Sequence, residues 1–187
     1  PSIKNGISVG CESHLETECC LLLEHDREVR RYNAQPHRFE WSDAGMKYSY
    51  TPDFLVYCTD GSFYLLEVKH NFEHLEETYR DKLLSFTEQC ENSGWVYRQW
   101  SIAQIHGHSN IDTLKYLYSR CHHIDPADKF FFGEAAQRIN WPTTLKQLMS
   151  QLPQFSPNLI CYLLFHRILR ADLTQSVTLD FLIEGFQ

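Results

Sequence analysis

The feature that most constrains the fold is a pair of short apolar segments joined by a turn. Residues 53–58 and 63–69 are rich in the branched and aromatic side chains that favour strands. Asp60 and Gly61 lie between them as a turn signal. Pro52 comes at the start of the first segment, where a missing backbone N–H is tolerated. A β-hairpin is therefore predicted over this stretch.

Charged residues mark the far ends of both predicted strands. Glu67 and Lys69 are two residues apart, so their side chains project from the same face of their strand. A working site needs Asp53 on that face as well. The length of the turn decides whether it lies there, because side chains alternate between the two faces.

A three-residue turn satisfies this requirement. A two-residue turn would pair Asp53 with Val68 and send the aspartate to the wrong face. A turn over residues 59–61 sets Asp53 opposite Glu67 instead, and its last residue is the glycine that a left-handed position needs. We predict this turn or, failing that, a bulge near Pro52.

The chemistry of these residues points to a hydrolase that uses a metal ion. Asp53 and Glu67 would repel each other on one face unless a cation lay between them. Hard oxygen ligands with room for water suit Mg²⁺, for which Mn²⁺ often substitutes. The backbone carbonyl of Val68 is a candidate ligand, and Lys69 is placed to hold or help deprotonate the attacking water. Such a set performs phosphodiester hydrolysis.

Periodicity divides the rest of the chain into two parts. Helices are predicted over 12–25 and 73–92, and extended segments over 28–32, 35–41, 47–50 and 95–105. After a linker at 106–110, which contains His106 and His108, helices are predicted over 111–121, 130–140, 144–152 and 157–171, and a strand-like segment over 173–182. We expect a mixed α/β domain at 1–108 and a small, helical, winged-helix-like domain at 109–187.

Several other residues have an ordinary structural interpretation. Trp95, Tyr97 and Trp100 alternate along a predicted strand, which favours core packing over base stacking. The acidic residues that begin the second helix stabilise its N-terminal end: Glu73, Glu76 and Glu77. Arg80 and Lys82 are candidates for phosphate contacts near the site.

The charge of the chain is uneven. All of the net charge of −7 lies in residues 1–108, whereas residues 109–187 are neutral. An acidic domain is unsuited to strong autonomous DNA binding, because phosphate neutralisation supplies most non-specific affinity. Such a domain can still act on DNA if a partner protein binds the DNA. No apolar run approaches the roughly 20 residues that a membrane span needs, so we expect no membrane partner.

The seven cysteines indicate a reducing compartment. Their number is odd, they form no CxxC motif, and several lie in apolar stretches, as is typical of reduced core thiols. The chain shows no basic-then-apolar leader. We therefore expect a cytoplasmic protein.

The order of these motifs resembles the PD-(D/E)XK nuclease superfamily and, within it, the N-terminal domain of TnsA, the endonuclease subunit of heteromeric bacterial transposases. The resemblance rests on motifs between about residues 10 and 105: an ESHLE helix, Gln35 and Pro36, YTPDFLV, the DG turn and LLEVKH. It implies a restriction-endonuclease-like mixed sheet flanked by helices, followed by a winged-helix domain.

The resemblance also assigns roles to residues. Asp53, Glu67 and Lys69 match the strand motif, and the helical glutamate of the family falls on Glu16. The alternative is Glu12, one turn earlier. We prefer Glu16 because the residues that follow it on the same face of the helix point to the core. The implied catalytic residues are therefore Glu16, Asp53, Glu67 and Lys69, and the implied metal ligands are Glu16, Asp53, Glu67 and Val68.

The function that the resemblance implies is Mg²⁺-dependent DNA cleavage at transposon ends in the bacterial cytoplasm. An integrase-like transposase subunit would cut the other strand and join the DNA, and an AAA+ regulator ATPase is the other implied partner. Two alternatives stay open: a stand-alone restriction or repair nuclease of the same superfamily, and a non-catalytic adaptor that bridges DNA and protein. Whether the C-terminal domain binds DNA or protein is also open, and we favour protein.

Overall fold

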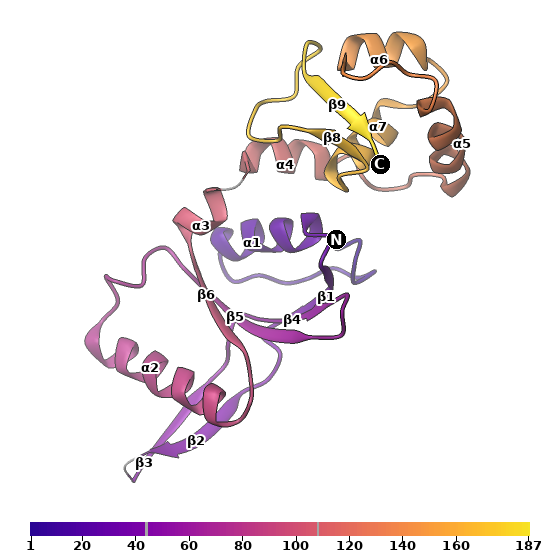
Figure 1. Ribbon diagram of the computed structural model, residues 1–187. Helices are drawn as coiled ribbons and strands as arrows, with labels where there is room; N and C mark the ends of the chain where they lie inside the picture. Colours follow the sequence, from indigo (N-terminus) through magenta and orange to yellow (C-terminus); the bar gives the residue numbers. More distant parts are fainter. Residues whose placement is uncertain (44, 108) are drawn as a thin grey trace. The chain divides into compact units, whose positions relative to one another are not determined.

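The computed structural model describes residues 1–43, 45–107 and 109–187 (Figure 1). The chain forms two compact units, Pro1–Gly107 and His108–Gln187, and each is described by itself. His108, at the expected domain boundary and in the expected linker, lies outside the described residues.

The first unit is a mixed α/β domain. Its elements are α1 (His14–His25), β1 (Val29–Ala34), β2 (Phe39–Asp43), β3 (Met46–Tyr50), β4 (Phe54–Cys58), β5 (Phe63–Lys69), α2 (Glu77–Asn92), β6 (Tyr97–Ser101) and α3 (Ile102–His106). The main sheet has the order β1-β4-β5-β6, in which β6 runs parallel to β5 and the other pairs are antiparallel. Strands β2 and β3 form a separate two-stranded ribbon. The predicted mixed α/β class is confirmed for this unit.

Two helices cover the main sheet, and Figure 1 shows α1 and α2 on opposite sides of it. On the α2 side, Leu83 and Phe86 form one core cluster with Leu55 and Leu65 of the sheet. The ribbon adds Trp41 and Tyr50 to the same cluster, and Trp95 and Tyr97 pack against it, as the core interpretation predicted. On the other side, α1 contacts β1 and β5. The ends of β4 and β5 are thus held by a packed layer on each face.

The hairpin between β4 and β5 has the predicted three-residue turn. Phe54 pairs with Leu66, and the backbone N–H of Cys58 donates to the carbonyl of Ser62 at 2.8 Å. Gly61 closes the turn with a φ of 89°, in the left-handed region. Continuing this register sets Asp53 opposite Glu67, so the predicted face of the aspartate is confirmed.

Local side-chain hydrogen bonds shift several predicted helix starts. Helix α1 begins at His14 rather than at residue 12, because the Ser13 hydroxyl caps it by accepting from the backbone N–H of Glu16. Helix α2 begins at Glu77 rather than at residue 73. The side chain of Asn71 accepts the backbone N–H of Glu73 at 2.7 Å, and this turn delays the helix.

The strand predicted over 95–105 is wrong in its second half. Strand β6 ends at Ser101, and α3 begins at Ile102. The side chain of Gln104 accepts the backbone N–H of Ser101 at 2.7 Å, which favours a helix start over a continued strand.

The second unit contains helices and a small antiparallel sheet. Its elements are α4 (Ile111–Tyr118), α5 (Pro126–Ala136), β7 (Thr143–Thr144), α6 (Leu145–Gln151), α7 (Pro157–Phe165), β8 (Leu169–Ala171) and β9 (Leu182–Phe186). The strand order is β7-β9-β8. The expected helical character of this part is confirmed, and the sheet is larger than the sequence suggested.

The end of the chain differs from the prediction in two places. The helix predicted over 157–171 ends at Phe165, because Arg167 has a φ of 55° that no right-handed helix contains. The segment predicted to be strand-like, 173–182, mostly connects β8 to β9. The carboxylate of Asp172 accepts hydrogen bonds from Thr174 and Gln175, which stabilises a turn there.

Two further expectations concern membranes and disulfides. Every helix in the described parts of the chain is too short or too polar to span a membrane. The cysteines form no disulfide among the described residues.

The turn geometry makes a testable prediction. Replacing Gly61 with alanine should lower the free energy of unfolding by about 1–2 kcal/mol, because an L-residue resists the left-handed region. Gly10→Ala is the matched control, since a methyl group there meets no atom within 4 Å and the residue is not left-handed. Urea unfolding measures both, and equal stabilities for the two variants would contradict the assigned turn.

Candidate active site

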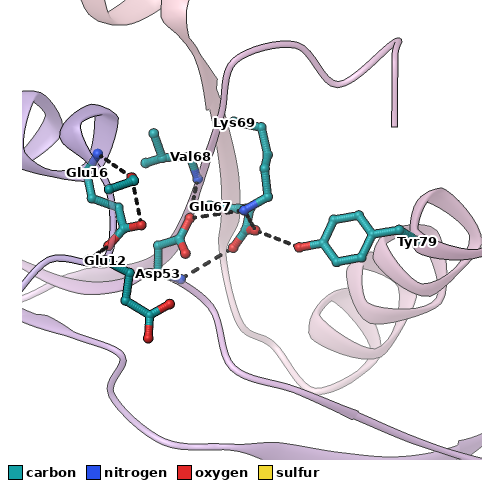
Figure 2. A network of polar contacts seen from close by, with 8 residues as sticks. Glu12, Glu16, Asp53, Glu67, Val68, Lys69 and Tyr79 are labelled. Atoms are coloured by element: carbon teal, nitrogen blue, oxygen red, sulfur yellow. Dashed lines mark hydrogen bonds and ion pairs between the residues drawn. The ribbon is translucent and has the colours of Figure 1, made fainter. Parts of the chain in front are cut away.

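Three of the predicted site residues meet at the ends of β4 and β5. The ammonium nitrogen of Lys69 lies 2.6 Å from Oε1 of Glu67 and 3.7 Å from Oδ2 of Asp53. Figure 2 shows the lysine reaching across to both carboxylates. The site is thus two acids on one face of a sheet with the ammonium of Lys69 bound to both.

Backbone hydrogen bonds fix both carboxylates. The backbone N–H of Val68 donates to Oδ2 of Asp53 at 2.7 Å, and the backbone N–H of Asp53 donates to Oε2 of Glu67 at 3.3 Å. Each strand therefore orients the acid of the other strand.

The sequence next to Asp53 explains this arrangement. Continuing the β4–β5 register places Pro52 opposite Val68. Proline has no N–H, so the regular exchange of ladder hydrogen bonds stops there. The N–H of Val68 turns to the Asp53 side chain instead. On the other side, the backbone N–H of Gln35 donates to the carbonyl of Asp53 at 2.8 Å and anchors the residue to the end of β1.

Burial increases from the lysine toward the glutamate. The exposed fractions of the side chains are 29% for Lys69, 16% for Asp53 and 1% for Glu67. The site therefore opens to solvent on the side of Lys69 and Asp53, while Glu67 forms its floor.

Burial and neighbouring charges shift the pKa values of Asp53 and Lys69. Burial, followed by the negative charge of Glu67, raises the pKa of Asp53 to about 7, against the opposing effects of the Val68 N–H and Lys69. Burial by itself would lower the pKa of Lys69, but the charge and hydrogen bond of Glu67 raise it above its usual range. Lys69 consequently remains an ammonium ion at neutral pH.

Glu16 lies in the N-terminal cap of α1. Its Oε1 accepts from the Ser13 hydroxyl at 2.8 Å, and its Oε2 accepts from the backbone N–H of Glu12 at 2.8 Å. The negative charge of Glu16 is one of the causes that raise the pKa of Asp53, so the two carboxylates are neighbours. Figure 2 shows Glu12 and Glu16 on the side of Asp53 away from Lys69, and the side chain of Glu12 is exposed.

The structure brings together part of the predicted metal-ligand set. Across 1–43, 45–107 and 109–187, no group of three or more His, Cys, Asp or Glu side chains is arranged to hold a metal ion. The pair of Asp53 and Glu67 still fits Mg²⁺, which commonly binds through one or two carboxylates and keeps several waters.

One site residue was missed by the sequence interpretation. The hydroxyl of Tyr79, on α2, donates to Oε1 of Glu67 at 3.0 Å. In the sequence this tyrosine is simply one member of the apolar stripe of its helix. The sequence held one indication of this contact, because the hydroxyl of a tyrosine that faces a core usually needs a hydrogen-bond partner.

The two basic residues of α2 differ in their surroundings. Arg80 donates to the backbone carbonyls of Glu73 and Leu75, so its guanidinium stabilises the loop before the helix. The ammonium of Lys82 lies 5.3 Å from the ring centre of Tyr50 and 6.0 Å from that of Tyr79. Of the two phosphate-contact candidates, Lys82 is the one that lies near a tyrosine hydrogen-bonded to Glu67.

A mixed sheet that carries an aspartate, a glutamate and a lysine at the ends of two paired strands defines a nuclease-like α/β domain. Residues 26–101 match the family described as TnsA-like endonuclease N terminal, so this segment is similar to the N-terminal domain of TnsA-like proteins. The predicted resemblance is thereby confirmed. The match includes Asp53, Glu67 and Lys69 and leaves out α1 and the second unit. A comparison with curated proteins gives no match.

The raised pKa of Asp53 predicts a pH effect on stability. The folded protein holds the Asp53 proton up to about pH 7, whereas the unfolded chain releases it near the ordinary value of 3.8. Metal-free protein should therefore lose stability as pH rises through this range, because the folded state binds more protons than the unfolded state.

Asp53→Asn should flatten this part of the profile in urea unfolding with a chelator present. The control is Asp60→Asn, because hydrogen bonds from Ser62 lower the pKa of this exposed residue. A profile for Asp53→Asn as steep as that of the unmodified protein would contradict the assigned environment.

Proposed function

We propose that this protein is a metal-dependent DNA endonuclease subunit of a cut-and-paste transposase, which hydrolyses phosphodiester bonds at transposon ends. The observation that carries the proposal is the pair of Asp53 and Glu67 bound by Lys69 inside a TnsA-like endonuclease domain. Two buried acids are costly without a cation, and a metal-dependent site supplies a functional reason to keep them.

Mg²⁺, or Mn²⁺ in its place, is the proposed cofactor. Asp53 and Glu67 would hold it, with the carbonyl of Val68 and the carboxylate of Glu16 as the other proposed ligands. The Val68 carbonyl points to the same side as its N–H, where Pro52 has no N–H to offer it. A bound Mg²⁺ would activate water and neutralise charge on the phosphate.

Lys69 has the role of a fixed positive charge in this proposal. Its pKa is raised, so it remains protonated and is suited to hold the attacking water or a phosphate oxygen. Its exposed fraction of 29% leaves the ammonium accessible from solvent, where a DNA strand would approach.

Partners complete the proposed function. Because residues 1–108 are acidic, a partner protein is needed to bind the DNA. We propose an integrase-like transposase subunit and an AAA+ regulator ATPase as partners, in the cytoplasm of a bacterium. The second unit would be a winged-helix-like domain, which its helices and three-stranded antiparallel sheet support. Exposed Phe130 and Phe131 on α5 favour protein as its target.

A non-catalytic adaptor is the second candidate function. One observation favours it: Lys69 offsets one charge of the acidic pair and the raised pKa of Asp53 lets a proton offset the other, so the pair can persist without a metal ion. The adaptor would bridge DNA and protein without cleaving DNA.

Cleavage assays distinguish these functions. With its partner transposase, transposon-end DNA and Mg²⁺, the protein should nick the DNA, and Asp53→Ala or Lys69→Ala should reduce the rate about 100-fold or more. Glu73→Ala, at an exposed acidic residue outside the site, should keep the activity. Intact DNA under these conditions would contradict the proposal. Cutting without a partner would indicate a stand-alone nuclease.

Glutamine substitutions separate the capping role of Glu16 from its proposed metal role. Glu16→Gln keeps an acceptor for the helix cap and removes the charge, so nicking should fall at least about ten-fold with little change in melting temperature. Glu12→Gln is the matched control and should alter neither quantity. Loss of activity in Glu12→Gln alone would transfer the ligand role to Glu12.

A further inference from the structure

The carboxylate of Glu67 is bound by donors of two kinds. Oε1 accepts from the ammonium of Lys69 at 2.6 Å and from the hydroxyl of Tyr79 at 3.0 Å. Oε2 accepts the backbone N–H of Asp53 at 3.3 Å. Figure 2 shows Tyr79 reaching Glu67 from α2, an element separate from the two strands that carry the acids.

These donors respond differently to a cation between the acids. The ammonium of Lys69 contacts both acids and offsets one of their two negative charges, so a divalent cation and the ammonium compete for the same oxygens. The hydroxyl of Tyr79 is neutral and approaches from the helix. It can keep its hydrogen bond when the ammonium moves away, and Glu67 then retains a donor on Oε1.

We infer that Tyr79 is a positioning residue for the proposed metal site, which holds Glu67 in place when Lys69 is displaced from it. This inference rests on the proposed function, because it assigns Tyr79 a role at the same site. Carboxylates that bind metal ions are commonly held by a second hydrogen-bonding group, and loss of that group weakens metal binding.

The surroundings of Tyr79 support this role. The ammonium of Lys69 lies 5.8 Å from the ring centre of Tyr79, so the ring face offers a favourable neighbour to a displaced ammonium.

Two more tyrosines lie behind Glu67. The hydroxyls of Tyr50 and Tyr97 are buried and make no hydrogen bond of standard geometry within the described parts of the chain, although Tyr50 still interacts with Glu67. Burial, followed by the charge of Glu67, raises the pKa of both residues. They come from β3 and β6, so phenols from three elements converge on one carboxylate. The hydroxyl of Tyr50 is therefore a second candidate donor to Glu67.

The test compares two tyrosine-to-phenylalanine variants of the full chain. Tyr79→Phe removes only the donor to Glu67, whereas Tyr57→Phe removes a hydroxyl from a residue near the turn end of β4. The measurement is the Mn²⁺ dissociation constant obtained by fitting the increase of melting temperature with Mn²⁺ concentration, together with the melting temperature in a chelator. Tyr79→Phe should raise this dissociation constant about ten-fold, and Tyr57→Phe should leave it unchanged.

A double variant and a direct binding measurement complete the test. Tyr50→Phe combined with Tyr79→Phe also removes the second candidate donor to Glu67, so its shift should equal or exceed that of the single variant. Mn²⁺ binding followed by electron paramagnetic resonance in the cold gives the same affinities on folded protein if a variant melts early.

The outcomes separate this inference from the proposed function. If Mn²⁺ stabilises the unmodified protein and both Tyr79 variants bind it equally well, the role of Tyr79 is overturned while the metal site stands. If Mn²⁺ neither binds nor stabilises the unmodified protein, the proposed metal site fails and the role of Tyr79 fails with it. A weakened affinity confined to the Tyr79 variants supports the inference.

Discussion

The alternation of side chains along a β-strand is the constraint on which the site depends. Asp53 shares a face with Glu67 and Lys69 only because three residues, the last a left-handed glycine, join their strands. With the acids on one face, their repulsion requires a nearby cation, and Lys69 supplies it from the same strand as Glu67. A local turn thus determines the electrostatics of the whole site.

Glu16 shows how one carboxylate can close the start of a helix and also act electrostatically on a neighbouring site. Its two oxygens close the start of α1 through Ser13 and Glu12, and its charge still acts on Asp53. A helix cap is a rigid support, because the backbone fixes its geometry. The hydrogen bonds that cap the helix would also hold the Glu16 carboxylate rigidly as a metal ligand at the edge of the site. A substitution that removes only the charge of Glu16 is therefore what separates the two roles.

Lys69 offsets one of the two charges of the acidic pair without a metal ion, and this has a consequence for the proposed reaction. An acid pair with no counter-ion would oppose folding, whereas a lysine two residues along the same strand reduces that cost. A metal ion would then exchange with an ammonium that is already present. Tyr79 and the backbone N–H of Asp53 are the groups that keep Glu67 oriented through such an exchange.

The sequence by itself determined the hairpin, its turn, the mixed α/β order and the three residues Asp53, Glu67 and Lys69, because strand alternation and turn chemistry act over a few residues. Only the tertiary structure decided where helices and strands end, as Ser101 and Arg167 illustrate, since a cap or one left-handed residue overrides periodicity. It also decided the partners of Glu67. Tyr79 meets that carboxylate because α2 packs beside the end of β5, and helical periodicity gives the face of a residue but not the atom that its hydroxyl will reach.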